Sequence, residues 1–96
     1  MVPTTKHSLK KLETLAKELG YTVRYEKGNF VSGYALVESR RMAIVNKFYE
    51  TEGRINVLLD ILGQYRRRPG ERVELSEPSA KLWGQLRPYL GIREEE

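Results

Sequence analysis

The chain has 96 residues, a length that supports one compact domain with a single core, which we place at residues 1–96. Apolar residues make up 40% of it, too many for a disordered chain, and no apolar run approaches the ~20 residues that span a bilayer. There is no cysteine, which excludes disulfides and thiolate metal sites. The first residues also lack the apolar segment of a secretory signal, so we expect a cytoplasmic protein.

The net charge is +4, and it is unevenly distributed. Residues 1–48 carry nine basic and four acidic side chains, whereas residues 49–96 carry eight and nine. Such a balance permits contact with nucleic acid without requiring it. We expect residues 1–5 and 92–96, which include the terminal Glu-Glu-Glu, to be flexible.

The first predicted element is a helix over SLKKLETLAKELG, residues 8–20. Its apolar residues recur at intervals of three and four, which forms one apolar stripe. Thr5 or Ser8 can cap its beginning, and Gly20 stands where a C-terminal glycine is favoured. The stripe consists of Leu9, Leu12, Leu15, Ala16 and Leu19.

Three strands are expected next. YTVRYE (21–26) alternates, so Tyr21, Val23 and Tyr25 share one face. After a turn at KGNFVS, the segments GYALVE (33–38) and MAIVNKFY (42–49) are apolar on both faces. We therefore expect cover on both sides of the sheet, from helices or from a partner subunit.

The second half predicts two more helices. TEGRINVLLDILGQYRRR (51–68) is a helix that Thr51 can cap and that places its arginines in the last turn. ERVEL (71–75) is a weak candidate for a fourth strand. SEPSAKLWGQL (76–86) predicts a third helix, with Pro88 as a stop. Its inward residues are expected to be Ala80, Leu82, Trp83 and Leu86.

This order, αβββα(β)α, predicts an α+β domain in which a small antiparallel β-meander packs with two or three helices.

Catalytic and cofactor signals are weak. Gly28 and Gly33 have the spacing of a phosphate-binding loop, but no Gly-Lys-Ser/Thr follows, so we interpret them as a turn and a bulged strand entry. The aromatic residues around them, Tyr25, Phe30 and Tyr34, are expected to pack at the core or its rim. His7 is the only histidine, so we predict no metal and no cofactor. Without a nucleophile or a triad, the sequence leans away from an enzyme.

The basic clusters give the leading hypothesis. Arginines next to a predicted strand and at the end of the second helix could converge, with Tyr65 available to stack on a base. This surface would contact nucleic acid or an acidic protein. Its predicted residues are Arg40, Arg41, Lys47, Arg66, Arg67 and Arg68, with Arg72 close to them in sequence.

Two alternatives stay open. The junction between the third strand and the second helix could hold a small-molecule or minor catalytic site built from Asn46, Glu50, Arg54 and Asp60. The doubly apolar strands could instead bury one face in a homodimer. We expect no membrane partner.

The run LAKELGYTVRYEKGNFVSGYALVESRRMAIVNKFYETEGRINVLLDIL resembles a group of small bacterial proteins of unknown function. More distantly it resembles, over roughly residues 9–64, the N-terminal part of the ImmA/IrrE-type metallopeptidases. In that family the last helix carries H-E-x-x-H, in which two histidines bind zinc. Those two histidines would fall on Leu59 and Gly63, and the glutamate on Asp60. The resemblance therefore implies the fold order without the peptidase chemistry.

Overall fold

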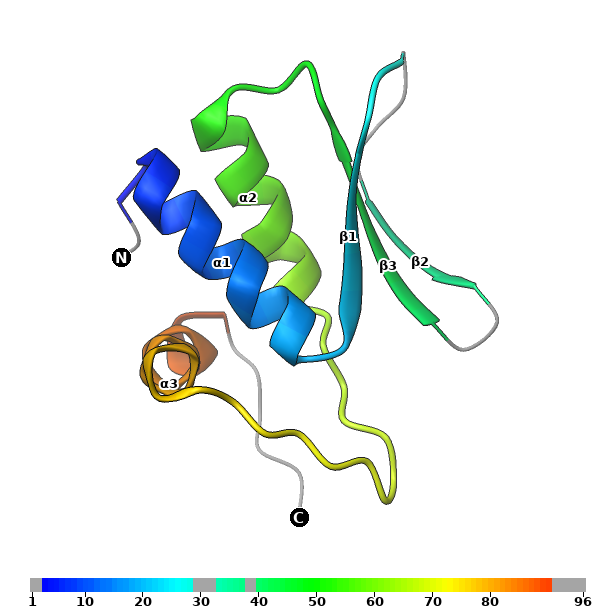
Figure 1. Ribbon diagram of the computed structural model, residues 1–96, viewed down its shortest axis with the longest axis vertical. Helices are drawn as coiled ribbons and strands as arrows, with labels where there is room; N and C mark the ends of the chain where they lie inside the picture. The colour runs from blue at the N-terminus through cyan, green and yellow to red at the C-terminus, as the bar shows by residue number, and fades with distance from the viewer. Residues whose placement is uncertain (1–2, 29–32, 38–39, 91–96) are drawn as a thin grey trace.

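A computed structural model describes residues 3–28, 33–37 and 40–90 of the chain. Three helices and three strands follow one another as α1 (Lys6–Glu18), β1 (Tyr21–Glu26), β2 (Gly33–Val37), β3 (Arg40–Asn46), α2 (Thr51–Leu62) and α3 (Glu77–Leu90) (Figure 1). The α+β class is confirmed. The single-domain assignment stays a prediction. Of the segments expected to be flexible, 1–5 and 92–96, residues 1–2 and 92–96 lie outside the described residues.

The predicted antiparallel meander is wrong. The strand order is β1-β3-β2, with β1 parallel to β3 and β2 antiparallel to β3. Hydrophobic pattern predicts strands but not their neighbours. Here β3, which is more buried than β1, takes the centre, where Ala43 and Val45 are fully buried. The more polar β1 takes an edge, where charged side chains discourage pairing with other chains.

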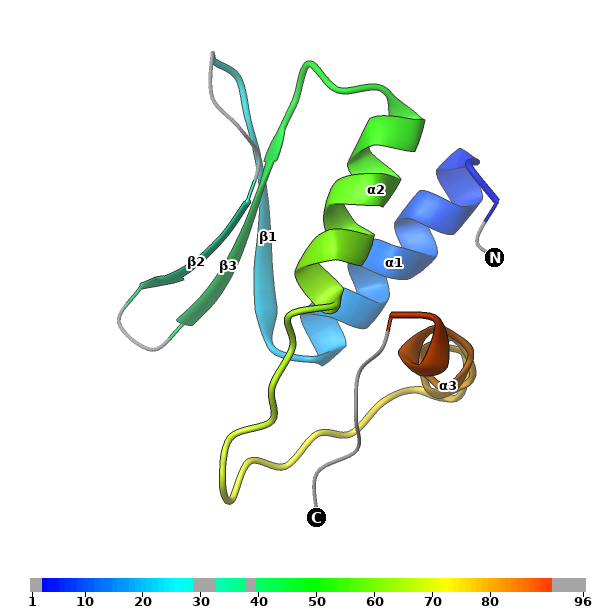
Figure 2. The same cartoon turned by 180° about the vertical axis from the view of Figure 1, so that it is seen from behind.

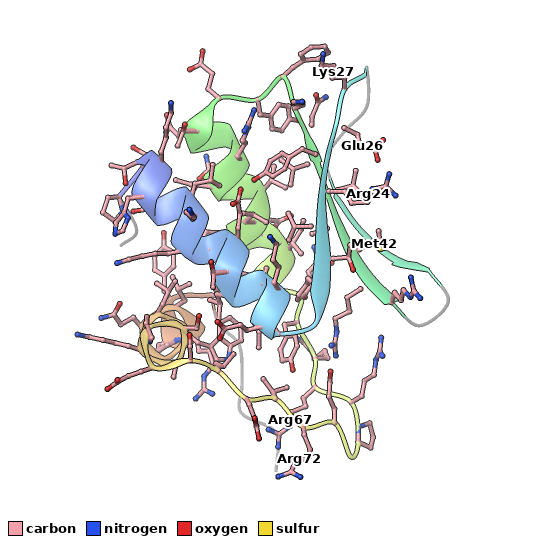
Figure 3. The ribbon with its side chains drawn as sticks, in the orientation of Figure 1. Arg24, Glu26, Lys27, Met42, Arg67 and Arg72 are labelled. Atoms are coloured by element: carbon pink, nitrogen blue, oxygen red, sulfur yellow. The ribbon has the colours of Figure 1, made fainter. Side chains whose placement is uncertain are left out.

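Among the described residues, helices cover one face of the sheet only, so of the two kinds of cover expected, helices on both faces is wrong and a partner subunit stays a prediction. Both α1 and α2 lie against the same face, and no described element covers the other (Figures 1 and 2). Figure 3 shows Arg24, Glu26 and Met42 on the side of the sheet that faces away from the helices. Met42 and Ile44 are half-buried there, beside the exposed ion pair between Arg24 and Glu26, with an N–O distance of 2.7 Å.

Helix α1 follows the sequence prediction closely. All five residues of its predicted stripe are buried. The Thr5 hydroxyl accepts a hydrogen bond from the Ser8 amide at 3.1 Å, which satisfies one of the free amides of the first turn. Gly20 follows the helix with a φ of +98°, a conformation that favours glycine.

Helix α2 is shorter than predicted. It begins at Thr51, so Glu50 precedes it in the capping position, and it ends at Leu62. Its last turn tightens, because the amides of Gln64 and Tyr65 bond to carbonyls three residues back. Tyr65 then turns into the core, and the three arginines that follow it lie outside the helix.

The chain between α2 and α3 has no regular structure, so the predicted fourth strand is absent from the described residues. Val73 and Leu75 nonetheless pack against the core. Helix α3 extends to Leu90 and includes Pro88, which was expected to stop it. Pro88 lies in the last turn, where the loss of one amide interrupts little of the helix.

The inward face of α3 is also narrower than predicted. Trp83 and Leu86 are buried, but Leu82 is only partly buried and Ala80 is exposed. Trp83 packs edge-on against Tyr65, with ring centroids 5.8 Å apart. Within the part of the chain that the structure describes, no helix is long and apolar enough to cross a membrane.

Candidate functional site

The centre of the predicted basic cluster is a buried ion pair. Arg41 is only 5% exposed, and its two terminal nitrogens donate to the two oxygens of Glu71 at 2.7 and 2.9 Å. The same guanidinium donates to the carbonyls of Leu19 at 3.2 Å and Arg66 at 2.9 Å. We call the Arg41–Glu71 pair the arginine clasp. It joins the end of α1, the beginning of β3 and the chain after α2.

Two aromatic rings enclose the arginine clasp. The Arg41 guanidinium carbon lies 4.8 Å from the centroid of the Tyr65 ring and 6.0 Å from that of Tyr21, within the range of a cation–π contact. Tyr65 is 7% exposed, and its hydroxyl is buried with no hydrogen-bond partner among the described residues. The prediction that Tyr65 stacks on a base is therefore wrong, because its ring belongs to the core.

The arginine clasp is electrically neutral and remains so over a wide pH range. The hydrogen bonds from Arg41 are the main cause that lowers the pKa of Glu71 from 4.5 to about 2. The same hydrogen bonds raise the pKa of Arg41. Burial raises the pKa of the Tyr65 hydroxyl. Arg41 is thus unavailable to an external anion, which corrects its predicted role.

Next to the arginine clasp, the chain makes a tight turn. The Glu71 amide donates to the Arg68 carbonyl at 3.0 Å, and the Arg68 amide donates to the Glu71 carboxylate at 2.9 Å. Pro69 and Gly70 occupy the middle of the turn, and Gly70 has a φ of +77°. These are the residues that a type II turn favours at its second and third positions.

Four exposed arginines lie in this turn or next to it in the chain, and we call them the basic end: Arg66, Arg67, Arg68 and Arg72. Figure 3 shows Arg67 and Arg72 at the same end of the molecule. Among the described residues, the ion pairs are Arg41–Glu71 and Arg24–Glu26, so no arginine of the basic end is neutralised by a carboxylate.

The other predicted members lie elsewhere. Arg40 is exposed and begins β3, but it precedes Arg41 by one residue and therefore points to the opposite face of the sheet. Lys47 follows the other end of β3. At the usual rise per strand residue it lies about 20 Å from Arg41. The structure thus brings together the arginines after α2, directs Arg40 to the opposite face of the sheet, and separates Lys47 from them.

The polar residues of the strand-to-helix junction shape its backbone. Asn46 donates to the carbonyl of Gly28 at 3.0 Å and accepts from the amide of Phe48 at 3.0 Å. Arg54 donates to the carbonyls of Tyr49 and Lys47 at 2.9 and 2.8 Å.

These bonds satisfy backbone groups where the chain leaves the sheet. The two carboxylates predicted for this site, Glu50 and Asp60, are exposed. Neither of them makes a side-chain hydrogen bond to Asn46 or Arg54 among the described residues. Asn46 and Arg54 thus hold the backbone of the junction, and the small-molecule or catalytic site there stays a prediction.

The predicted turn at Gly28 and Gly33 is described only in part. Gly28 has a φ of +149°, which favours glycine, whereas Asn29 and Phe30 lie outside the described residues. Gly33 begins β2, opposite Ile44. Tyr25 is half-buried against the core, and its hydroxyl donates to Glu13. Burial and this carboxylate together raise the pKa of Tyr25.

Glu71 is the important residue that sequence reasoning did not identify. It lies 30 residues from Arg41, and nothing local connects the two. The sequence did, however, indicate that Arg41 is buried. By strand alternation it shares a face with Ala43 and Val45, and an arginine on a buried face requires a partner.

No metal site is formed by the described residues, in which no three His, Cys, Asp or Glu side chains gather as ligands. Comparisons with protein-family models, with curated proteins and with solved structures found no match. The resemblance to the ImmA/IrrE-type metallopeptidases therefore stays an expectation. At the positions of its ligands, Leu59 is half-buried on α2 and Gly63 directly follows that helix.

Proposed function

We propose that this protein is a non-catalytic binding module that holds the phosphate backbone of nucleic acid at the basic end. One observation carries the proposal. Glu71, the carboxylate nearest to the basic end, is paired with Arg41. The four arginines of the basic end are exposed and have no carboxylate partners among the described residues. The guanidinium group donates two parallel hydrogen bonds to a phosphate, which suits arginine to this ligand.

The form of the basic end favours contact with phosphates over the reading of bases. Its arginines lie in an irregular segment and a turn, not along a helix that could enter the major groove. Tyr65, the aromatic residue adjacent to them, is buried in the core. We therefore expect binding with little sequence preference, governed by charge.

Fluorescence polarisation of labelled random-sequence DNA, single- and double-stranded, tests the proposal. For about three phosphate contacts, raising the salt concentration from about 50 to about 200 mM should weaken binding roughly fortyfold. The variant Arg66→Glu/Arg67→Glu/Arg68→Glu should lose the binding. A matched control, Lys6→Glu/Lys17→Glu/Lys27→Glu, changes the net charge equally at exposed positions outside the basic end.

Three outcomes would overturn the proposal. One is the absence of binding at low salt. Another is equal weakening by both triple variants, which would indicate only a response to net charge. The third is binding of an acidic protein such as polyglutamate with no binding of DNA, which would make the partner of the basic end an acidic protein surface.

Self-association is the weaker candidate. The sheet face without helices carries the half-buried Met42 and Ile44, which is one observation in its favour. Arg24, Glu26 and Arg40 surround them on that face, whereas obligate homodimers bury largely apolar surfaces. Sedimentation across a range of protein concentrations tests this alternative.

A further inference from the structure

A groove runs between α1 and α3, on elements that take no part in the basic end. It consists of two hollows, of about 470 and 140 Å³, that share Lys11, Leu82 and Gln85 as lining residues. We call it the α1–α3 groove. Figure 1 shows α3 end-on beside α1, so the two helices cross steeply there.

The two helices line the groove with equivalent faces. Each contributes residues at positions i, i+3, i+4 and i+7, the spacing of one side of a helix. On α1 this side lies next to the apolar stripe, and on α3 it lies next to the buried Trp83 and Leu86. The residues are His7, Lys10, Lys11 and Thr14 from α1, and Pro78, Lys81, Leu82 and Gln85 from α3.

The charged side chains among the described residues that line the α1–α3 groove are positive. Three lysines line it, and no aspartate or glutamate does. The two carboxylates of α1 have hydrogen-bond partners other than the lysines. Glu13 accepts from the Tyr25 hydroxyl, and Glu18 accepts from the amide and hydroxyl of Ser76 at 2.8 and 2.9 Å. Because Ser76 lines the groove, Glu18 lies at its edge. Among the described residues, however, neither carboxylate forms an ion pair with the lysines, so the lining still favours an acidic ligand.

The groove also has apolar surface. Leu82 is partly buried at its centre, and Pro78 lies at one end. Pro3 and Tyr89 lie at the other end, and Tyr89 is 60% exposed, which is unusual for so large an aromatic side chain. A ligand that fits must therefore carry apolar groups as well as negative charge.

The length of the groove favours a peptide over a small molecule. Its lining residues extend from Ser76, just before α3, along that helix to Tyr89, which is about 20 Å at the rise of an α-helix. About four turns of a helix or about six residues of an extended chain have that length. A compact small molecule would fill one hollow only.

We propose that the α1–α3 groove binds an acidic amphipathic segment of a partner protein. Its apolar side chains would contact Leu82 and Tyr89, and its carboxylates would pair with Lys10, Lys11 and Lys81. This is the arrangement by which amphipathic helices generally enter grooves, with anchors at i, i+3, i+4 and i+7. The site is separate from the basic end, so the protein would hold two different partners.

The test is fluorescence anisotropy of a labelled peptide of about 14 residues, with leucine at the anchor spacing and glutamate elsewhere. One control peptide has glutamine in place of every glutamate, and another has serine in place of every leucine. We expect saturable binding of the first peptide only. The variant Lys10→Glu/Lys81→Glu should raise its Kd about tenfold or more, because two attractions become repulsions.

Matched variants separate the groove from the overall charge. Lys17→Glu/Lys27→Glu makes the same charge change outside the groove and should leave the peptide Kd within about twofold, as should Arg66→Glu/Arg67→Glu. Tyr89→Ala should weaken binding without unfolding the protein, since the ring is mostly exposed.

The proposal is overturned if the acidic amphipathic peptide does not saturate, if the serine peptide binds equally well, or if Lys17→Glu/Lys27→Glu weakens binding as much as the groove variant. Failure of DNA binding at the basic end would leave these results unaffected, because the peptide assay does not depend on that surface.

Discussion

Arg41 and Glu71 are 30 residues apart in the chain and form two parallel hydrogen bonds of 2.7 and 2.9 Å, with the guanidinium almost completely buried. The pair attaches the irregular chain after α2 to the beginning of the central strand. It also fixes the Arg68–Glu71 turn, since the Glu71 carboxylate accepts from the Arg68 amide. The positions of the exposed arginines next to this turn therefore depend on the buried Arg41.

Replacing one partner of the arginine clasp should lower the free energy of unfolding. Glu71→Gln leaves the Arg41 charge buried without its counter-charge, and we expect a loss of about 2–3 kcal/mol, below the usual cost of breaking a deeply buried pair because Glu71 keeps 21% of its side chain exposed. Urea unfolding measures this loss. The control is Glu74→Gln, an exposed carboxylate on the same segment, which should change stability by less than about 0.5 kcal/mol. Equal effects of the two variants would show that the clasp contributes no specific stability.

The stability should also depend on pH through Glu71. Its pKa falls from 4.5 to about 2 on folding, so the folded protein binds fewer protons than the unfolded chain between these values. The stabilising contribution is therefore complete above about pH 4.5 and is lost as the pH falls through about 2. The difference in unfolding free energy between the native protein and Glu71→Gln should shrink over this interval. A constant difference from pH 7 to pH 2 would contradict the assignment.

The N-terminal cap of α1 gives a local prediction. Thr5→Ala removes the acceptor for the Ser8 amide and should cost about 1 kcal/mol, the usual value of such a cap. Thr4→Ala at the adjacent exposed position serves as the control and should cost less than about 0.5 kcal/mol. Thermal unfolding followed by circular dichroism distinguishes the two. A loss from Thr4→Ala equal to that from Thr5→Ala would show that the cap is not the cause.

Local patterns predicted local structure well. The stripe of α1, its cap at Thr5 and its end at Gly20 all follow from residues within one or two turns of each other. The alternation of Tyr21, Val23 and Tyr25 likewise places them on the face of β1 that meets the helices. These features depend on helix and strand periodicity alone, which the sequence carries directly.

The relations between distant elements could not be predicted in this way. Strand order depends on which edges pair, and the patterns of β2 and β3 are equally apolar, so sequence order suggested a meander where the chain instead places β3 in the middle. The same holds for the basic cluster. Arg41 and Arg66 are close in space, yet one guanidinium is buried and the other exposed, because only Arg41 lies opposite a carboxylate.

Two glycines should respond in opposite directions to the same substitution. Gly20 has a φ of +98°, and an added Cβ would lie 3.1 Å from Nη1 of Arg41. Gly20→Ala should therefore destabilise the protein by about 1–2 kcal/mol, through backbone strain and through displacement of the clasp. Gly84 lies within α3 with nothing within 4 Å of an added Cβ, so Gly84→Ala should stabilise by about 0.5–1 kcal/mol.

Urea unfolding of the two glycine variants, alone and each combined with Glu71→Gln, tests this prediction and its link to the clasp. If the added methyl group at Gly20 acts partly by displacing Arg41, its cost should be smaller once Glu71 no longer pairs with that guanidinium. Gly84→Ala is far from the clasp in the chain and contacts none of its residues, so its effect should add to that of Glu71→Gln. Strict additivity at both glycines would mean that Gly20 acts through its backbone conformation alone.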